Sequence, residues 1–111
     1  NIGENTLGIE IKYDGLMKKY EGNVYIEYAE KSNEAVVGWT PSGIMKKDNS
    51  WAFLIGDYDI SYVFSYAFLR AVLDRPKLKE LVKLRETKTS RGYTMNKGFA
   101  EKRCLKVFNW T

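Results

Sequence analysis

The clearest feature of the sequence is a regular alternation of apolar and polar positions over residues 8–14. Side chains of a β-strand alternate between its two faces, so this pattern predicts a strand with one buried face. We expect that face to carry Ile9, Ile11 and Tyr13 and to pack on the core. The opposite face carries the polar side chains Glu10, Lys12 and Asp14.

A second alternating segment at residues 23–28 predicts another strand close to the first in sequence. The residues expected to point inward are Val24, Ile26 and Tyr28. The opposite face of this strand carries Tyr25 and Glu27. The two segments therefore predict two polar strand faces that each present at least one carboxylate.

Further strands are predicted in the middle and at the end of the chain. Residues 51–55 are apolar throughout, as in a strand that is covered on both faces, and residues 62–66 are expected to form its hairpin partner. Residues 93–99 and 105–110 predict short strands that complete the sheet.

Helical spacing appears between these strands. The apolar residues that recur at helical intervals are Leu69, Val72 and Leu73. Pro76 suits the first turn of a continuing helical segment, which we expect to end near Arg85. The polar and basic residues 87–92 then predict a loop.

These elements predict a mixed α/β fold in which residues 1–111 form a single domain. No internal repeat or low-complexity tract divides the sequence. No apolar stretch is long enough to span a membrane, and the first residues do not resemble a signal peptide. We therefore expect a cytoplasmic protein that does not enter a membrane.

The absence of histidine from the sequence restricts the available chemistry most strongly. It excludes a histidine general base, a Ser-His-Asp triad and every metal site that uses histidine. The single cysteine, Cys104, excludes an intrachain disulfide and a zinc site built from several thiolates. Catalysis by this chain would have to use carboxylates, lysine, tyrosine and a metal that prefers oxygen ligands.

The pair Glu10 and Lys12 has the residue types that metal-dependent phosphodiester cleavage needs. Mg²⁺ or Mn²⁺ binds carboxylates, waters and a phosphate oxygen, and a nearby lysine stabilises negative charge. Side chains two apart on a strand point the same way, so the pair shares one face. Exposed strands carry such pairs as ordinary ion pairs worth less than ~1 kcal/mol, and the pair alone does not decide between the two interpretations.

Four short blocks raise the specificity of the pattern. They are residues 9–14 (IEIKYD), 22–28 (GNVYIEY) and 42–44 (SGI), followed by the apolar strand that begins at Trp51. Their order and spacing resemble small phage-type nucleases of the PD-(D/E)xK, or restriction-endonuclease-like, superfamily; residues 91–93 (RGY) add a weaker similarity. The resemblance covers residues 8–66 and implies a mixed central sheet flanked by helices.

This resemblance implies a metal-dependent nuclease that hydrolyses phosphodiester bonds in DNA, with Mg²⁺ or Mn²⁺ as cofactor. Glu10 would be a metal ligand and Lys12 the catalytic lysine. Glu27 would be a further ligand or would organise the site, unless it is an ordinary surface glutamate. Asp14 continues the same face and is a candidate ligand or rim residue. The superfamily also has an aspartate upstream whose position falls near Asn1, so this carboxylate lies further upstream or is missing.

The formal net charge of +4 is compatible with a polyanionic partner. We select as candidate phosphate contacts Lys18, Lys19, Lys46, Lys47, Lys88 and Arg91. The alternative for each of them is ordinary surface charge that keeps the protein soluble. Trp39 is the best candidate for an exposed aromatic residue that stacks on an unpaired base.

Three functions follow from the sequence. The first is a DNA nuclease, with RNA as the less favoured substrate. The second is a non-catalytic nucleic-acid-binding domain on the same fold with an incomplete active site, and the third is a protein-interaction module. By analogy with junction-cutting nucleases we also expect a homodimer, and the phage-type resemblance implies the host-cell cytoplasm.

Overall fold

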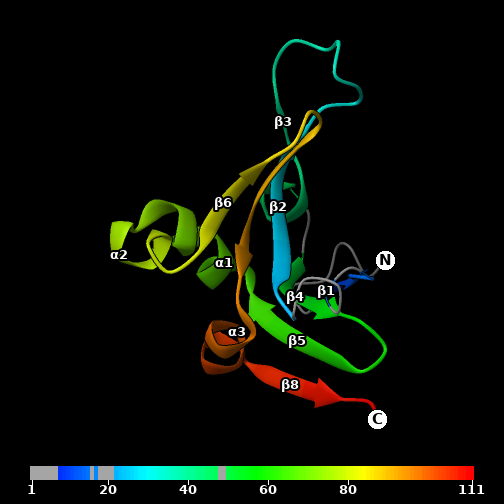
Figure 1. The fold of residues 1–111 in the computed structure, drawn as a ribbon, viewed down its shortest axis with the longest axis vertical. Helices are drawn as coiled ribbons and strands as arrows, with labels where there is room; N and C mark the ends of the chain where they lie inside the picture. The colour runs from blue at the N-terminus through cyan, green and yellow to red at the C-terminus, as the bar shows by residue number, and fades with distance from the viewer. Residues whose placement is uncertain (1–7, 16, 18–21, 48–49) are drawn as a thin grey trace.

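The strands of the computed structural model divide into two four-stranded sheets, which we call sheet A and sheet B (Figure 1). The structure describes residues 8–15, 17, 22–47 and 50–111. Three α-helices and a short 3-10 helix accompany the sheets in this part of the chain. The α/β class is therefore confirmed, but the described strands form two sheets where we expected one mixed central sheet.

Sheet A has the strand order β1-β4-β5-β8. Its strands are β1 (Gly8–Tyr13), β4 (Ser50–Gly56), β5 (Ile60–Ser65) and β8 (Lys106–Asn109). β1 runs parallel to β4, and the other neighbours are antiparallel. The Asp57 carboxylate accepts hydrogen bonds from two backbone amides and fixes the turn between β4 and β5. The predicted hairpin and the predicted strand near the end of the chain are both confirmed.

Sheet B is antiparallel throughout and has the order β3-β2-β7-β6. Its strands are β3 (Thr40–Pro41), β2 (Val24–Glu30), β7 (Ser90–Met95) and β6 (Lys83–Glu86). One face is apolar and buried, and it includes Val24, Ile26 and Tyr93. Tyr25 and Glu27 alternate with these inward residues of β2, as predicted, and lie on the opposite face.

Helix α1 (Tyr66–Asp74) packs against both sheets and completes the core. It begins at Ser65, whose hydroxyl accepts a hydrogen bond from a backbone amide of the first turn. Its buried face includes Leu69 and belongs to one core cluster with apolar side chains of sheets A and B. The Tyr93 hydroxyl of β7 donates to the Leu69 carbonyl at 2.8 Å and ties sheet B to the helix.

The helical segment after α1 is shorter than we predicted. α2 (Pro76–Lys79) has Pro76 in its first turn, as expected, but it ends after four residues. The predicted continuation to Arg85 is wrong because this residue lies in β6, opposite Gly92 of β7. Strand pairing outweighs local helical spacing here, and the predicted loop at 87–92 shrinks to the turn before β7. No helix in the described residues is long and apolar enough to cross a membrane.

Helix α3 (Lys97–Arg103) occupies part of a segment that we predicted as a strand. β7 ends at Met95, and the Asn96 side chain accepts a hydrogen bond from the Phe99 amide at 2.8 Å. Asparagine is a preferred N-cap residue, so it ends the strand and starts a helix. The strand prediction for residues 93–99 was therefore wrong beyond Met95.

β1 exposes the face that we expected to be buried. Ile9, Ile11 and Tyr13 are 45%, 74% and 56% exposed. The strand itself was predicted correctly, but its orientation was wrong, because the alternation does not reveal which face of a two-sided strand meets the core. β4 is buried over most of its length, as predicted, although Trp51 at its start is 44% exposed.

Candidate active site

Glu10 and Lys12 lie on the same face of sheet A as core residues. In the parallel pairing of β1 with β4, Glu10 lies beside Phe53 and Lys12 lies beside Ile55. Paired residues of neighbouring strands point to the same side of the sheet, and both β4 residues are buried. The polar face of β1 therefore lies on the core side of sheet A, where Glu10 is half-buried and Lys12 is exposed at the edge of the core.

A pocket of about 410 Å³ opens beside this face, lined by residues of β1, β2 and the segment after β3. It brings together the three predicted catalytic residues Glu10, Lys12 and Glu27, and the predicted phosphate contact Lys46. The other residues that line it are Ile11, Glu30, Ser42, Gly43 and Phe53. Residues from two sheets thus form a single pocket with carboxylates on two strands and two lysines.

Glu10 is held from helix α1. The Tyr66 hydroxyl donates a hydrogen bond to Glu10 Oε1 at 3.0 Å. Tyr66 is 3% exposed, and its ring packs on Phe53 with 5.8 Å between the ring centroids. The Arg70 guanidinium lies 5.2 Å from the centroid of the same ring. A buried and packed donor therefore orients one oxygen of the Glu10 carboxylate.

Glu27 is held from strand β7 through a chain of hydroxyl groups. Ser90 Oγ donates to Glu27 Oε1 at 2.9 Å, and it lies 2.6 Å from the Tyr25 hydroxyl. A serine hydroxyl carries one hydrogen, so Tyr25 is the donor in the second bond. Burial raises the pKa of Tyr25, the Ser90 hydrogen bond lowers it, and the Glu27 charge raises it, with a net increase. Tyr25 therefore keeps its proton at neutral pH.

The turn at residues 42–44 is seated directly on β2. Gly43, in the 3-10 helix η2 (Gly43–Met45), has φ +50, and a Cβ atom on it would collide with the Glu27 carbonyl oxygen. Ser42 N donates to the Tyr28 carbonyl at 3.1 Å, and Ile44 is fully buried. Tyr28 itself packs against the core, as predicted. The glycine lets the turn approach β2 closely enough to form one wall of the pocket.

Ser42 contributes an unusual polar group to this wall. The residue is 4% exposed and lines the pocket. Among the residues that the structure describes, its Oγ is a buried side-chain oxygen without a hydrogen-bond partner. An unsatisfied buried hydroxyl costs about 1–3 kcal/mol, so such groups commonly have a ligand or water as partner.

Two predicted ligands, Glu10 and Glu27, face the pocket from different sheets. Mg²⁺ is commonly bound through one or two carboxylates and completes its coordination with waters and phosphate oxygens, so this donor set suits Mg²⁺ or Mn²⁺. Asp14 lies elsewhere: it lines the adjoining pocket, and its Oδ2 accepts a hydrogen bond from Tyr25 N at 3.5 Å. Within the described ranges, no group of three or more Asp, Glu, His or Cys residues is arranged to hold a metal.

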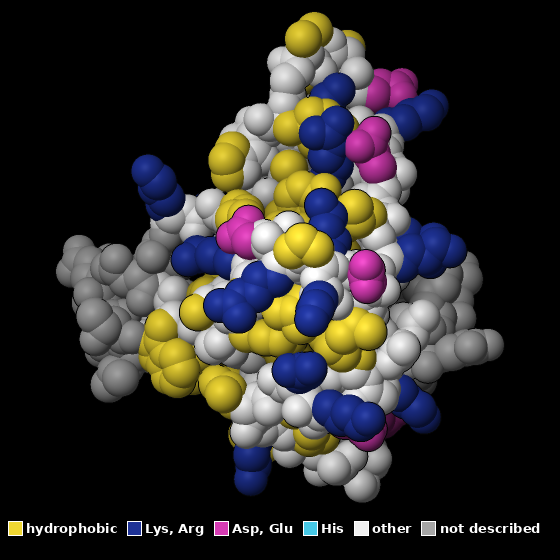
Figure 2. Space-filling model, turned by 90° about the vertical axis from the view of Figure 1, so that its left-hand side faces the viewer, with side chains coloured by type: hydrophobic (Ala, Val, Ile, Leu, Met, Phe, Trp, Pro, Cys, Tyr) yellow, Lys and Arg dark blue, Asp and Glu magenta, His cyan; other side chains and the backbone are white. Residues whose placement is uncertain are grey.

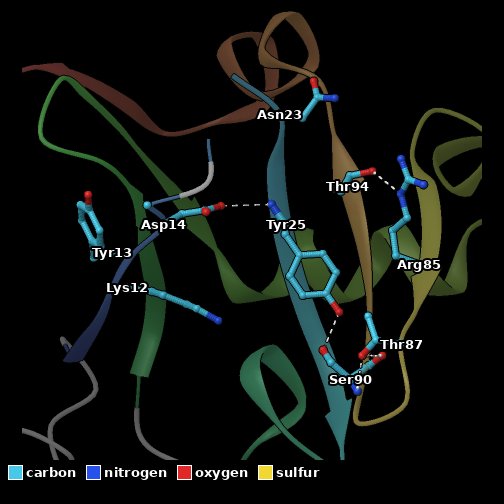
Figure 3. A pocket seen from close by; sticks show the side chains of 10 residues that line it. Lys12, Tyr13, Asp14, Asn23, Tyr25, Arg85, Thr87, Ser90 and Thr94 are labelled. Atoms are coloured by element: carbon cyan, nitrogen blue, oxygen red, sulfur yellow. Dashed lines mark hydrogen bonds between the residues drawn. The ribbon is translucent and has the colours of Figure 1, made fainter. Parts of the chain in front are cut away.

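The adjoining pocket has a volume of about 620 Å³ and shares Lys12 with the first (Figure 3). Lys12 extends toward it from β1, and Tyr25 lies in its centre on β2 (Figure 3). The remaining lining residues come from β1, β6, β7 and the segments beside them: Tyr13, Asp14, Gly15, Asn23, Arg85, Thr87, Ser90 and Thr94. This second pocket is therefore rich in hydroxyl groups.

Of the predicted phosphate contacts, Lys46 alone among those the structure describes lines a pocket. Lys47 is exposed and lines neither pocket, and Lys88 forms an exposed ion pair with Glu34 at 3.2 Å. Arg91 is paired with a glutamate and lies over a tryptophan ring: its partners are Glu86 at 2.7 Å and Trp39 at 4.1 Å. Lys18, Lys19 and Asn1 lie outside the described residues.

Trp39 is half-buried, because the Lys31 ammonium also lies over its ring at 4.8 Å. Our expectation of an exposed stacking residue at this position was therefore only partly correct. Basic side chains gather on another part of the surface, the side on which α2 and β6 lie (Figure 2). The exposed basic residues of these two elements and of the segment between α1 and α2 are Arg75, Lys77, Lys79, Lys83 and Arg85.

Several residues of the site were missed from the sequence. Tyr66, Ser90 and Glu30 carry no spacing signal, because strand pairing and helix packing alone bring Tyr66 to Glu10 and the other two to the pockets. Arg85 was expected at the end of a helix and was not among the selected phosphate contacts, whereas it lies in β6. Ser42 belongs to a block that we noted, and its position between a proline and a glycine was the one available signal.

Comparison with protein-family models, with curated proteins and with solved structures finds no match to this chain. The two pockets are therefore the features of the chain that bear on its function.

Proposed function

We propose that the protein is a divalent-metal-dependent nuclease of the PD-(D/E)xK, or restriction-endonuclease-like, type that hydrolyses phosphodiester bonds in DNA. The observation that carries the proposal is the meeting of Glu10, Lys12 and Glu27 in one pocket. Glu10 and Lys12 come from sheet A and Glu27 from sheet B, and residues far apart in sequence orient both carboxylates. A surface ion pair on an exposed strand would not need this support.

In this proposal Glu10 and Glu27 hold the cation, which supplies positive charge beside a phosphate oxygen. The Lys12 ammonium donates hydrogen bonds toward the reacting phosphate and stabilises the negative charge that grows there. Lys46, which lines the same pocket, neutralises a second phosphate oxygen.

The test is cleavage of plasmid, single-stranded and branched DNA in the presence of Mg²⁺ or Mn²⁺. We expect Glu10→Gln and Lys12→Gln each to reduce cleavage by at least about a hundredfold, because each removes a charge that acts on the reacting phosphate. Glu101→Gln and Lys77→Gln, which change exposed residues outside both pockets, serve as matched controls. Cleavage that is unchanged in Glu10→Gln and Lys12→Gln would refute the proposal.

A non-catalytic nucleic-acid-binding domain is the second candidate. The position of Asp14 favours it, because this carboxylate accepts a hydrogen bond from Tyr25 N in the adjoining pocket and does not line the pocket of Glu10 and Glu27. This candidate predicts DNA binding that depends on salt and is independent of divalent metal. Isothermal titration with Mg²⁺ separates the two candidates. Only the nuclease requires that the protein binds Mg²⁺ and that Glu10→Gln weakens this binding.

A further inference from the structure

Tyr25 forms a flat floor in the second pocket. Its ring lies against the backbone of Gly92 on the neighbouring strand, where a Cβ atom would come within 2.5 Å of Tyr25 Cζ. Gly92 is therefore required for the ring to lie across β7. The hydroxyl is fixed to Ser90 at 2.6 Å. Packing at one side and a hydrogen bond at its end hold the ring in place inside the pocket that it lines.

Two cationic side chains stand on opposite sides of this floor. Lys12 reaches toward Tyr25 from β1, and Arg85 lies beyond β7 on β6 (Figure 3). Arg85 Nε donates to Thr94 Oγ1 at 3.4 Å, which leaves the rest of the guanidinium group exposed at the rim. The carboxylate in the lining, Asp14, accepts a hydrogen bond from the Tyr25 amide. The lining therefore carries two positive charges against one negative charge.

We infer that this pocket binds an unpaired nucleotide of the substrate strand, next to the phosphate that is cleaved. The base stacks on the Tyr25 ring, the phosphate on one side meets Lys12, and the phosphate on the other side meets Arg85. The hydroxyls of Thr87 and Thr94 are hydrogen-bonded within the β6–β7 hairpin and shape the wall of the pocket beside the base. The inference rests on the proposed function only in placing the cleaved phosphate at Lys12; the binding itself needs no cleavage.

The chemistry of the pocket selects an unpaired nucleotide for a physical reason. A base inside a continuous duplex is covered on both faces by its neighbours, so it must be unstacked before it reaches a protein ring. Aromatic floors beside positive groups that follow the backbone are typical of proteins that bind single strands. The inference therefore names single-stranded or branched DNA as the preferred substrate class.

The experiment measures binding of a fluorescein-labelled oligothymidylate of about 10 nucleotides by anisotropy, at low salt and with EDTA present. Tyr25→Leu removes the floor and is expected to weaken binding about tenfold or more, whereas Tyr25→Phe keeps the ring and stays within about twofold. Arg85→Gln is expected to weaken binding several-fold and to lower the slope of log affinity against log salt by about 0.7. Lys102→Gln, exposed on α3 and outside both pockets, is the matched charge control.

A thymine–adenine duplex of the same length should bind more weakly and should not respond to Tyr25→Leu. Circular dichroism shows whether that variant folds; if it does not, a 2-aminopurine base in the single strand reports stacking on the unaltered protein by a change of its emission. Wild-type affinity in a folded Tyr25→Leu variant, wild-type affinity in Arg85→Gln, or unchanged 2-aminopurine emission would overturn the inference.

The use of EDTA separates this inference from the proposed function. Binding that depends on Tyr25 and Arg85, together with no cleavage in metal, supports the nucleotide pocket and refutes the nuclease. Cleavage that depends on Glu10, together with DNA binding that does not depend on Tyr25, supports the nuclease and refutes the nucleotide pocket.

Discussion

The Ser90 hydroxyl donates a hydrogen bond to Glu27 Oε1 at 2.9 Å, although the two residues are 63 positions apart in the sequence. Pairing of β7 with β2 brings them together, with a register shift between Glu27 and Ala29. A bulge of this kind redirects side chains at one point of a sheet. The carboxylate of the first pocket is thereby connected to Tyr25 of the second pocket.

We predict that Ser90→Ala lowers the activity more than it lowers the stability. The substitution removes the donor to Glu27 and the acceptor of Tyr25, so the carboxylate loses its fixed orientation. Cleavage should fall about tenfold, while the free energy of unfolding should fall by about 1 kcal/mol for a partly buried hydrogen bond. Rates and urea unfolding measured on the same preparation check both values. Ser90→Thr keeps the hydroxyl and should restore most of the rate; equal loss of activity in both variants would contradict this role.

Ser42→Ala should lower neither the stability nor the activity. Its buried hydroxyl has no partner among the described residues, so removal should leave the free energy of unfolding unchanged or raise it by up to about 1 kcal/mol. Cleavage should be unchanged, because the hydroxyl is buried and does not face a phosphate in the pocket. Urea unfolding and cleavage rates test this pair of outcomes. A variant that is markedly less stable would show that the hydroxyl has a structural partner instead.

Gly43→Ala should destabilise the protein by about 2 kcal/mol or more, because the new methyl group meets the Glu27 carbonyl and the backbone has positive φ. Gly38→Ala is the matched control, since Gly38 also has positive φ but has nothing within 4 Å of an added Cβ. Gly38→Ala should lower the free energy of unfolding by no more than about 1 kcal/mol. Urea unfolding of both variants isolates the steric part, and equal losses would show that conformational strain alone explains Gly43.

Stability should decrease in strongly alkaline solution. Burial raises the pKa values of Tyr93, Tyr62 and Tyr25, so these phenols stay protonated in the folded state at pH values where they ionise in the unfolded chain. The folded state then binds more protons, and the free energy of unfolding falls as pH rises above about 10. Urea unfolding at pH about 8 and about 11 measures the effect. Tyr93→Phe should make the pH dependence smaller; a wild-type stability that is independent of pH in this range would contradict the burial argument.

Much of the strand pattern could be predicted from the sequence, because alternation is a local signal. β1, β2, β4 and β5 were all found, and the inward residues of β2 were identified correctly. The orientation of β1 was predicted wrongly, because its apolar face is exposed and its polar face is on the core side of the sheet. Ile11 is 74% exposed, whereas Glu10, on the other face, is half-buried beneath Tyr66. A strand that partly buries a glutamate and exposes its isoleucines breaks the usual rule that the apolar face is covered, and such exceptions are expected at functional sites.

The candidate site was predictable only where its residues share a strand. Glu10 and Lys12 are two positions apart, so their common face followed from strand geometry. Strand pairing and helix packing over long sequence separations bring Tyr66 to Glu10 and bring Ser90 and Arg85 to the second pocket, which no local pattern encodes. The position of Arg85 was also not predictable, because it lies in β6, which pairs with β7 where we expected a helix.

The central claim is that Glu10 and Glu27 act together in one metal-dependent site. The most direct test is a double-mutant cycle of DNA cleavage in Mg²⁺ with wild type, Glu10→Gln, Glu27→Gln and the double variant. Residues that act as one unit give non-additive effects, so each single variant should lose at least about a hundredfold in rate and the double variant should lose no more than the worse single variant. A Glu27→Gln variant that cleaves at the wild-type rate, or two losses that simply multiply in the double variant, would contradict the claim.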